Sequence, residues 1–247
     1  MNAADSQLTV GALVARYPMT RAVFERHQID YCCGGKQSLA EASAVRGVAL
    51  DALHQEIDRA IALAAADTDE PSWEGSNSTA ICRYIVERFH VPLREELQRL
   101  EALATRVVAA HGTDRPEVVA IQRVLRSFRG ELEDHMAKEE QVLFPAIERA
   151  ERSGSISGCG FEGPIGQMIS EHEDAGEALA NLRRLSNGFM PPASACATFQ
   201  ALYEGLAHIE SEMHRHVHLE NEILFPRALA MAENLQVGIQ TGATVPP

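Results

Sequence analysis

Two segments of the chain repeat each other, and this repeat constrains the fold more than any other feature. Residues 135–145 read HMAKEEQVLFP and residues 216–226 read HVHLENEILFP, so His, Glu, Leu, Phe and Pro match without a gap. Residues four apart lie on one face of an α-helix, about one turn from each other. The repeat therefore predicts two helices that each present an imidazole and a carboxylate together. The matched pairs are His135 with Glu139 and His216 with Glu220.

A further histidine precedes each copy at nearly the same distance. His90 lies 45 residues before the first copy, and His172 lies 44 residues before the second. Leucines also recur seven and ten places after each of these histidines. The pattern predicts a duplicated pair of helices, in which each half supplies one histidine from its first helix and a histidine and a glutamate from its second.

The heights of these residues along the predicted helices agree. A turn is predicted near Thr113, with His90 23 residues before it and His135 22 residues after it. At a rise of ~1.5 Å per residue, two antiparallel helices bring both histidines to one height. The later connections give similar matches, the last one looser by a few residues. Six groups from four helices should therefore converge on one layer of a bundle.

Composition supports an all-α fold. The chain has 247 residues, of which 45% are hydrophobic and only 5% aromatic, and Ala, Leu, Glu and Arg outweigh the residues that favour strands. The net charge of −13 argues against nucleic acid or an anionic membrane surface as a partner. No apolar run approaches the ~20 residues that span a bilayer, and no signal peptide is evident. Five cysteines without a disulfide framework favour a cytoplasmic location.

The sequence divides into a small helical N-terminal domain and an up-down-up-down four-helix bundle. Ser38 and Glu41 form a capping-box pattern in the first domain. The polar stretch DTDEPSWEGSNS is typical of a linker. The predicted parts are residues 1–66 for the first domain, 67–78 for the linker, 79–235 for the bundle and 236–247 for a disordered tail. The predicted bundle helices are 79–111, 116–152, 164 to the NGFMPP segment, and 193–232.

The donor set predicts a metal centre with two ions. Four histidines and two glutamates are too many for one tetrahedral zinc, and mixed imidazole and carboxylate ligation suits iron or manganese. Two metals would each receive two histidines, with both glutamates bridging. The alternative is a pair of solvated surface residues that happen to lie four apart, but both pairs lead into the same apolar Leu-Phe-Pro segment. Those leucines and phenylalanines are predicted core residues: Leu143, Phe144, Leu224 and Phe225.

These motifs resemble a known family. The hemerythrin-like di-iron fold is resembled by four segments: FHVPLREEL, HMAKEEQVLFP, the EH pair at 171–172 and HVHLENEILFP. The segment YCCGGK resembles the short domain that precedes this fold in one family, the iron–sulfur cluster repair di-iron proteins, also called RIC (repair of iron centres) proteins. The resemblance covers roughly residues 7–232. It implies two iron ions in an oxo- and carboxylate-bridged centre held by the six residues, and the restoration of iron–sulfur enzymes damaged by nitric oxide or oxidants. One departure is the longer, Gly- and Ser-rich loop around Cys159.

Neighbouring residues offer supporting roles and one alternative set of ligands. Four side chains are candidates for orienting the ligating imidazoles, although a solvated helix face explains them nearly as well: Glu131, Glu171, His111 and Glu212. The resemblance implies that Glu131 and Glu171 line a path to solvent. His218 and Glu222 are also four apart, with His214 before them, but they point about 200° away from His216 and Glu220. We expect a solvated or partner-facing stripe there.

Cys32 and Cys33 are adjacent, which is unusual. A disulfide between neighbours is strained and easily reduced, so the pair is a candidate redox pair, or a thiol donor or acceptor for iron or nitric oxide. The alternative is one buried and one exposed thiol in a turn. Lys36 is expected to favour the thiolate. The dispersed cysteines are predicted to be ordinary residues: Cys82, Cys159 and Cys196.

Three functions compete. The first is a repair protein whose di-iron centre binds nitric oxide, reduces it as a nitric oxide reductase would, or releases iron. The second is a hemerythrin-type oxygen or nitric oxide carrier or sensor without catalysis, which would not need a second domain with paired thiols. Iron storage is disfavoured, because ferritin-type sites use Glu-x-x-His spacing. The expected partners are nitric oxide or oxygen, damaged iron–sulfur proteins or a cluster assembly scaffold, and a second copy of the chain as a homodimer.

Overall fold

A computed structural model describes residues 8–32, 34–63, 73, 75–156 and 160–240, with side chains up to residue 235. The described elements are helical apart from one isolated β-bridge between Thr9 and Ser38, so the all-α prediction is confirmed. The chain forms two compact units. One combines Met1–Asn77 with His214–Arg227, and the other combines Ser78–Met213 with Ala228–Pro247.

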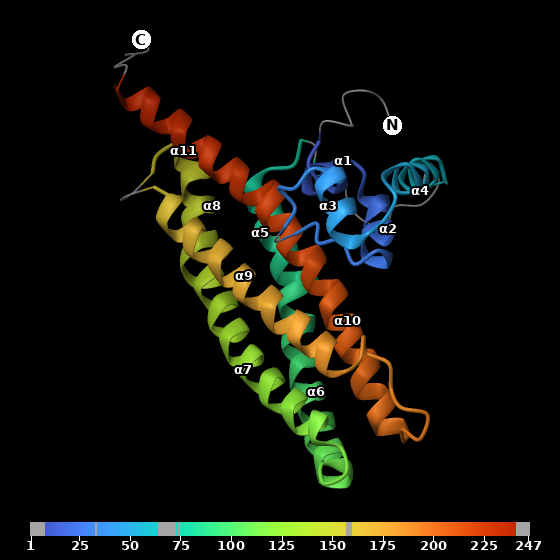
Figure 1. Ribbon diagram of the computed structural model, residues 1–247. Helices are drawn as coiled ribbons and strands as arrows, with labels where there is room; N and C mark the ends of the chain where they lie inside the picture. Colours follow the sequence, from blue (N-terminus) through green and yellow to red (C-terminus); the bar gives the residue numbers. More distant parts are fainter. Residues whose placement is uncertain (1–7, 33, 64–72, 74, 157–159, 241–247) are drawn as a thin grey trace. The chain divides into compact units, whose positions relative to one another are not determined.

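The second unit is a bundle of long helices that run alternately up and down (Figure 1). α7 packs against α6 and α9, and α5 packs against α8. The helices follow the predicted order, although α11 continues to Gln240, where the sequence predicts an irregular tail from residue 236. The elements are α5 (Ser78–Ile85), α6 (Val91–His111), α7 (Pro116–Lys138), α8 (Phe144–Ser153), α9 (Glu162–Leu185), α10 (Ala197–Leu219) and α11 (Phe225–Gln240).

Apolar residues at helical spacing fill the centre of this bundle. Ile81, Ile85, Leu97 and Leu100 are fully buried on the first long helix. The predicted core residues Leu143, Phe144, Leu224 and Phe225 are at most 3% exposed, so that prediction is confirmed. Burial of a Leu or Phe side chain contributes about 1.5–3 kcal/mol. These residues therefore anchor the two repeated segments in the core of the bundle.

Three turns in the long helices are π-helical: η4 (Val86–His90), η5 (Glu139–Leu143) and η6 (Glu220–Leu224). In each, the residue after the turn donates its backbone N–H to the carbonyl five residues earlier. A proline follows directly after that donor in all three cases. Proline has no N–H and clashes with the carbonyl four residues before it, so it disfavours a regular α-helix at this point. The prolines are Pro92, Pro145 and Pro226.

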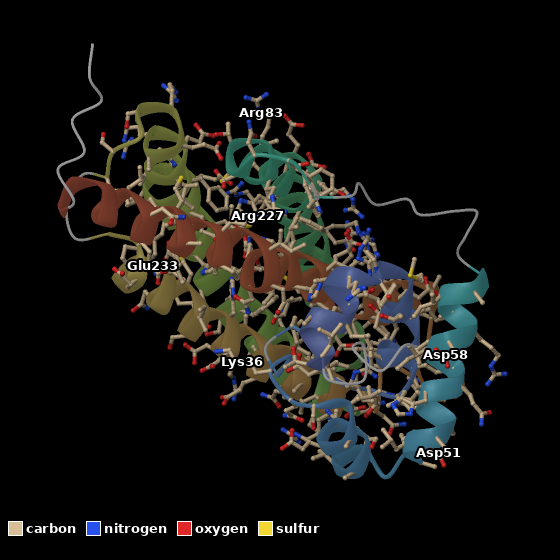
Figure 2. The ribbon with its side chains drawn as sticks, turned by 90° about the horizontal axis from the view of Figure 1, so that it is seen from above. Lys36, Asp51, Asp58, Arg83, Arg227 and Glu233 are labelled. Carbon is tan, nitrogen blue, oxygen red and sulfur yellow. The ribbon has the colours of Figure 1, made fainter. Side chains whose placement is uncertain are left out.

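The first unit contains four short α-helices from the N-terminal part of the chain. The predicted capping box at Ser38 and Glu41 is present, and the polar face of α4 carries the exposed Asp51 and Asp58 (Figure 2). Phe24, Leu53 and Ile57 are fully buried. The helices are α1 (Val10–Arg16), α2 (Arg21–Arg26), α3 (Leu39–Arg46) and α4 (Leu50–Leu63), with a 3₁₀ turn η2 (Pro18–Thr20) before α2.

A glycine contact fixes the loop between α2 and α3. Gly11 donates its N–H to the carbonyl of Gly35 at 2.8 Å. A Cβ on Gly35 would lie 2.5 Å from the carbonyl oxygen of Tyr31 and 3.1 Å from the Cα of Gly11, so this position has no room for a side chain. Gly35 does not have a positive φ; it is required because two backbone segments approach each other here.

None of the helices in the described part of the chain combines the length and the apolar character that crossing a bilayer requires.

Candidate metal centre

The six predicted ligands are buried polar side chains, and three of them lie in the π-turns. His90 ends η4, Glu139 begins η5 and Glu220 begins η6, so each π-turn carries one of them. Burying an imidazole or a carboxylate is costly unless the group is hydrogen-bonded or binds a metal. None of the six is more than 3% exposed: His90, His135, Glu139, His172, His216 and Glu220.

The bundle unit itself brings four of these residues together. The Nε2 atoms of His135 and His172 are 3.1 Å apart. Oε2 of Glu139 lies 3.4 Å from Nε2 of His90 and 3.5 Å from Nε2 of His135. The carboxylate of Glu139 therefore lies between imidazoles from two different helices, as a bridging ligand would.

The remaining two residues come from the continuous helix α10–η6–α11. Nε2 of His216 is 2.9 Å from Oε1 of Glu220. The parts of this helix on both sides of His214–Arg227 belong to the bundle unit. The six residues form two sets, in each of which one ligand atom per residue lies within 4.8 Å of the others. The sets are His90, Glu139, His216 and Glu220, and His135, Glu139, His172 and Glu220.

Two carboxylates orient two of the imidazoles from behind. Nδ1 of His90 is 2.7 Å from Oε1 of Glu140, and Nδ1 of His135 is 2.9 Å from Oε2 of Glu171. An ionised carboxylate only accepts hydrogen bonds, so each Nδ1 carries the proton. In a neutral imidazole Nε2 then has its lone pair toward Glu139, which is the tautomer that binds a metal.

Cationic neighbours keep both orienting carboxylates ionised. Burial alone would raise the pKa of Glu171, but hydrogen bonds from Lys138, Gln167 and His135 outweigh it and lower the pKa to about 2. Glu140 is similar: burial opposes ionisation, and hydrogen bonds from Arg94 and His90 still lower its pKa. Both carboxylates therefore remain acceptors for imidazole N–H groups at neutral pH.

The donor set fits a cation. Lone pairs of Nε2 on His90 and His135 converge on Glu139, whose carboxylate also presents lone pairs, and such atoms repel in a buried space unless a positive charge lies among them. Doubly protonated imidazoles would also satisfy Glu139. However, four histidines and two carboxylates without a thiolate are the ligand types that iron or manganese binds.

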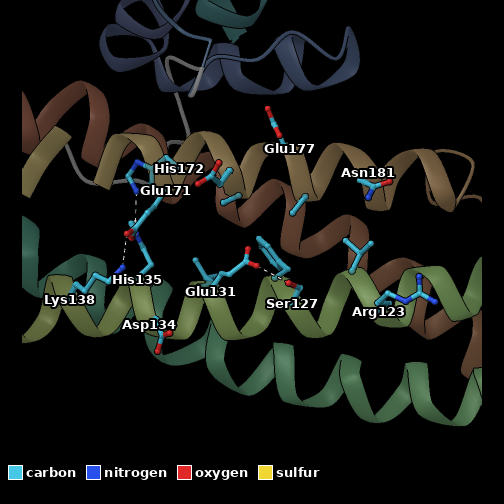
Figure 3. Close-up of a pocket in the computed structure, with 16 residues that line it drawn as sticks. Arg123, Ser127, Glu131, Asp134, His135, Lys138, Glu171, His172, Glu177 and Asn181 are labelled. Carbon is cyan, nitrogen blue, oxygen red and sulfur yellow. Dashed lines mark hydrogen bonds and ion pairs between the residues drawn. The ribbon is translucent and has the colours of Figure 1, made fainter. Parts of the chain in front are cut away.

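A pocket of about 770 Å³ between α7 and α9 reaches His135 and His172 (Figure 3). Glu171 lies at this end beside His135 and Lys138. Acidic side chains outnumber basic ones along the pocket. The charged lining residues are Arg123, Glu131, Asp134, Lys138, Glu171, Asp174 and Glu177.

The four predicted orienting residues occupy different places. Glu171 contacts the predicted ligand His135. Glu131 is exposed, lines the pocket and accepts a hydrogen bond from Ser127. Glu212 forms an ion pair with Arg88, two residues before His90. His111 corrects the prediction: it ends α6, twenty-one residues or ~32 Å from His90, and its ring stacks on Phe199.

Glu140 is an orienting residue that the sequence pattern did not single out. It follows the predicted ligand Glu139 directly, and two adjacent residues of a helix do not share a face. The cross-helix contact with His90 explains its role, since Arg94, one turn after His90, also binds it at 2.9 Å. One signal was present in the sequence: His90 and His135 lie almost equally far from the turn near Thr113, which places His90 opposite this part of the second helix.

The predicted solvated stripe on α10 is packed. The ring of Tyr31 meets those of His214 and His218 edge-on, with centroids 5.8 and 5.5 Å apart. His218 is only 4% exposed, and its Nδ1 is 3.4 Å from the carbonyl oxygen of Tyr31. These histidines face the N-terminal part of their own chain, so the solvated interpretation is wrong for the buried His218, and the packed face is turned toward the same chain and not toward a partner.

The thiols differ in their surroundings. Cys32 is 4% exposed, and its Sγ donates to Oδ1 of Asp30 at 3.3 Å. The charge of Lys36 acts on Glu222, and its influence on the thiols stays a prediction. Cys33 and Cys159 lie outside the described residues. Cys82 is buried in α5, and Cys196 is exposed.

Comparison with known proteins defines the class first. Residues 83–228 match the Hemerythrin HHE cation binding domain, so the bundle is a hemerythrin-type cation-binding domain. Residues 6–61 match ScdA_N, a Domain of Unknown function (DUF542).

Curated relatives then define the family. The iron-sulfur cluster repair protein YtfE of Citrobacter koseri is 38% identical over 222 residues, which cover 90% of this chain and 96% of the relative. The proteins of the same name from Escherichia coli O81 and Escherichia fergusonii are 38% and 37% identical over the same shares. The chain belongs to this family of iron–sulfur cluster repair proteins.

Proposed function

We propose that this protein repairs damaged iron–sulfur clusters and that its six buried histidines and glutamates hold two iron ions. The family supports the first part, since the relatives are named for that role. The observation that carries the second part is the sharing of Glu139 and Glu220 between two four-residue sets. Each set would hold one ion with two imidazoles, and both carboxylates would bridge.

Iron at such a site supplies redox chemistry and open coordination positions for a small molecule such as nitric oxide or oxygen. The protein's own contribution is to fix the ligands. Glu140 and Glu171 hold the Nδ1 protons of His90 and His135, so that both Nε2 atoms face inward. Loss of such an orienting partner typically lowers metal affinity 10- to 100-fold.

The pocket between α7 and α9 gives ions and small molecules a route to His135 and His172. Its excess of carboxylates attracts cations, and the ion pair of Lys138 with Glu171 lies beside the histidines. This charge pattern suits the passage of iron as cargo, whereas uncharged nitric oxide needs no such lining. We therefore favour iron donation as one activity of the centre, alongside nitric oxide binding.

The N-terminal domain is proposed to deliver or accept reactants, because the Cys32–Cys33 pair lies there while the six ligands lie beyond residue 78. A carrier or sensor without catalysis is the competing function. It would bind nitric oxide or oxygen at the same centre but would not restore a damaged enzyme. The ScdA_N match favours repair over a plain carrier.

Iron quantification with Mössbauer spectroscopy on the purified full chain tests this proposal. We expect about two coupled irons per chain, and loss of at least one in His216→Ala, because removing a primary ligand leaves too few donors. His208→Ala is the matched control, since His208 lies exposed two turns earlier on α10. Full iron content in His216→Ala would refute the ligand assignment.

Repair is then measured on a dehydratase whose iron–sulfur cluster has been damaged by nitric oxide. The iron-loaded protein is expected to restore activity, and His216→Ala to fail. A protein that binds nitric oxide at the iron centre but leaves the dehydratase inactive would be a carrier or sensor.

A further inference from the structure

One carboxylate in the N-terminal unit organises the loop that carries Cys32. Oδ1 of Asp30 accepts the backbone N–H of Cys32 at 2.9 Å and the thiol Sγ of the same residue at 3.3 Å. Oδ2 accepts the backbone N–H of Gly34 at 2.9 Å. A Cβ on Gly34 would lie 3.1 Å from Oδ2, so the glycine lets the carboxylate approach this closely.

In the contact between Asp30 and Cys32, the thiol is the hydrogen-bond donor and the carboxylate is the acceptor. An ionised carboxylate only accepts hydrogen bonds, so the thiol must carry its proton to donate. A negative charge this close also disfavours the thiolate. Since the thiolate is the nucleophile and the metal ligand, Cys32 is held in its unreactive form. Its burial restricts it further.

The same loop is fixed from the other side by the ligand-bearing helix. The Nδ2 of Asn221 donates to the carbonyl of Cys32 at 3.2 Å, and Nδ1 of His218 lies 3.4 Å from the carbonyl oxygen of Tyr31. Asn221 directly follows Glu220 in the chain. The helix thus holds the backbone of the loop, while Asp30 holds the sulfur.

We propose that Asp30 is a positioning residue for Cys32, which keeps the thiol protonated and turned toward its carboxylate until this hydrogen bond breaks. The consequence for repair rests on the proposed function: Cys32 would exchange iron or a nitrosyl group only after leaving Asp30. Burial raises the pKa of the Tyr31 hydroxyl, and the negative charges of Glu25 and of an ionised Cys32 raise it further, so Tyr31 is the neighbour that interacts with Cys32 directly. Other contacts of the titratable groups around the loop are these. Tyr31 donates to Glu25, His214 and His218 pack on Tyr31, and Lys36 acts on Glu222.

Alkylation of Cys32 by iodoacetamide, followed across pH by peptide mass mapping of the full chain, tests this proposal. The thiolate attacks carbon, an S–C bond forms and iodide leaves. Asp30→Asn keeps an acceptor but removes the charge. We expect its half-maximal rate at a pH at least one unit lower, and alkylation at pH 7 about tenfold faster. Asp51→Asn on α4 is the matched control and should behave as the unchanged chain.

The shape of the pH profile separates charge from structure. If Asp30→Asn only loosened the loop, the rate would rise equally at every pH, including the high-pH plateau, with an unchanged midpoint. That result, or a profile identical to that of the unchanged chain, would overturn the proposal. Iron content and repair activity are not part of this measurement. The inference can therefore fail while the proposed function stands, and repair can fail while the Asp30 effect is observed.

Discussion

At the scale of single residues, the candidate metal centre depends on the carboxylates that hydrogen-bond the predicted histidine ligands as much as on the ligands themselves. Glu140 and Glu171 each bind the Nδ1 of one histidine, and each is held in turn by a cation, Arg94 or Lys138. These chains of contacts run from the surface to the buried layer. They set the tautomers of His90 and His135 before any metal is bound, so the site is organised in advance.

The first prediction tests whether Glu171 acts by orienting the His135 imidazole or only by adding a carboxylate to the pocket. Glu171→Gln removes the ionised acceptor of the His135 Nδ1 proton, and we expect iron affinity to fall about 10- to 100-fold. Glu131→Gln is the matched control, because Glu131 lines the same pocket but accepts from Ser127. Its iron affinity should stay within about twofold. Competition with a chelator of known affinity measures both, and equal losses in the two variants would contradict the assigned roles.

The sequence predicted the six candidate ligands but only part of their surroundings. His135, Glu139, His216 and Glu220 were found because duplication writes the same spacing twice. The role of Glu140 depends on a contact between two helices, which no local pattern contains. His111 fails for a related reason: its chemistry suits an orienting residue, but its position along α6 puts it at the far end of the helix.

At the scale of elements, the three π-turns interrupt the regular α-helices at the positions of predicted ligands. Each turn carries a predicted ligand at its first or last residue, and each precedes a proline by one residue. Because the proline cannot donate, the wider turn loses no backbone hydrogen bond at that position. The sequence predicted continuous helices here, although a proline at the same place in each ligand segment was a visible signal of a local irregularity.

A second element-scale feature fixes the start of the helix that leads to His90. Glu151 of α8 accepts the N–H groups of Ser78 and Thr79 at 2.7 and 3.0 Å, and the hydroxyl of Thr79 at 2.6 Å. A carboxylate here satisfies N–H groups that a helix N-terminus leaves without partners and interacts favourably with the helix dipole. Burial opposes ionisation, but these hydrogen bonds prevail and lower the pKa of Glu151.

Glu151→Ala should therefore lower the free energy of unfolding at pH 7 by about 1 kcal/mol, as loss of a helix cap does. A lowered folded pKa means that this contribution is fully present above the ordinary value of 4.5, and is lost as the pH falls toward the folded pKa. Urea denaturation at pH 7 and pH 4 measures the difference. Glu148→Ala on the same helix should change stability by less than about 0.5 kcal/mol, and a pH-independent effect of Glu151→Ala would contradict the capping role.

At the scale of the whole molecule, the segment that carries two of the proposed ligands also belongs to the N-terminal unit. His214–Arg227 groups with the N-terminal residues, and it carries His216 and Glu220 on one face and His214, His218 and Asn221 on another. The sequence predicted two domains separated by a linker, and those boundaries stay a prediction. It could not show that the helix has two buried faces, since histidine and asparagine at the second face look like solvated residues. Removal of the residues before 75 would strip the packing from His214 and His218.

This double role predicts that iron loading stabilises the N-terminal unit. A ligand that binds only the native state stabilises it by about 2.7 kcal/mol at 100 times its dissociation constant, and His216 and Glu220 lie on the segment that holds Tyr31 and Cys32. The amides of Val10 and Gly11, which donate to Gln37 and Gly35, report on this unit. Their hydrogen exchange, followed by mass spectrometry, should slow severalfold when the full chain is loaded with iron. His208→Ala should keep this iron-dependent slowing, and His216→Ala should lose it. If hydrogen exchange at these two amides is the same with and without iron, the segment His214–Arg227 does not couple the metal centre to the loop that carries Cys32.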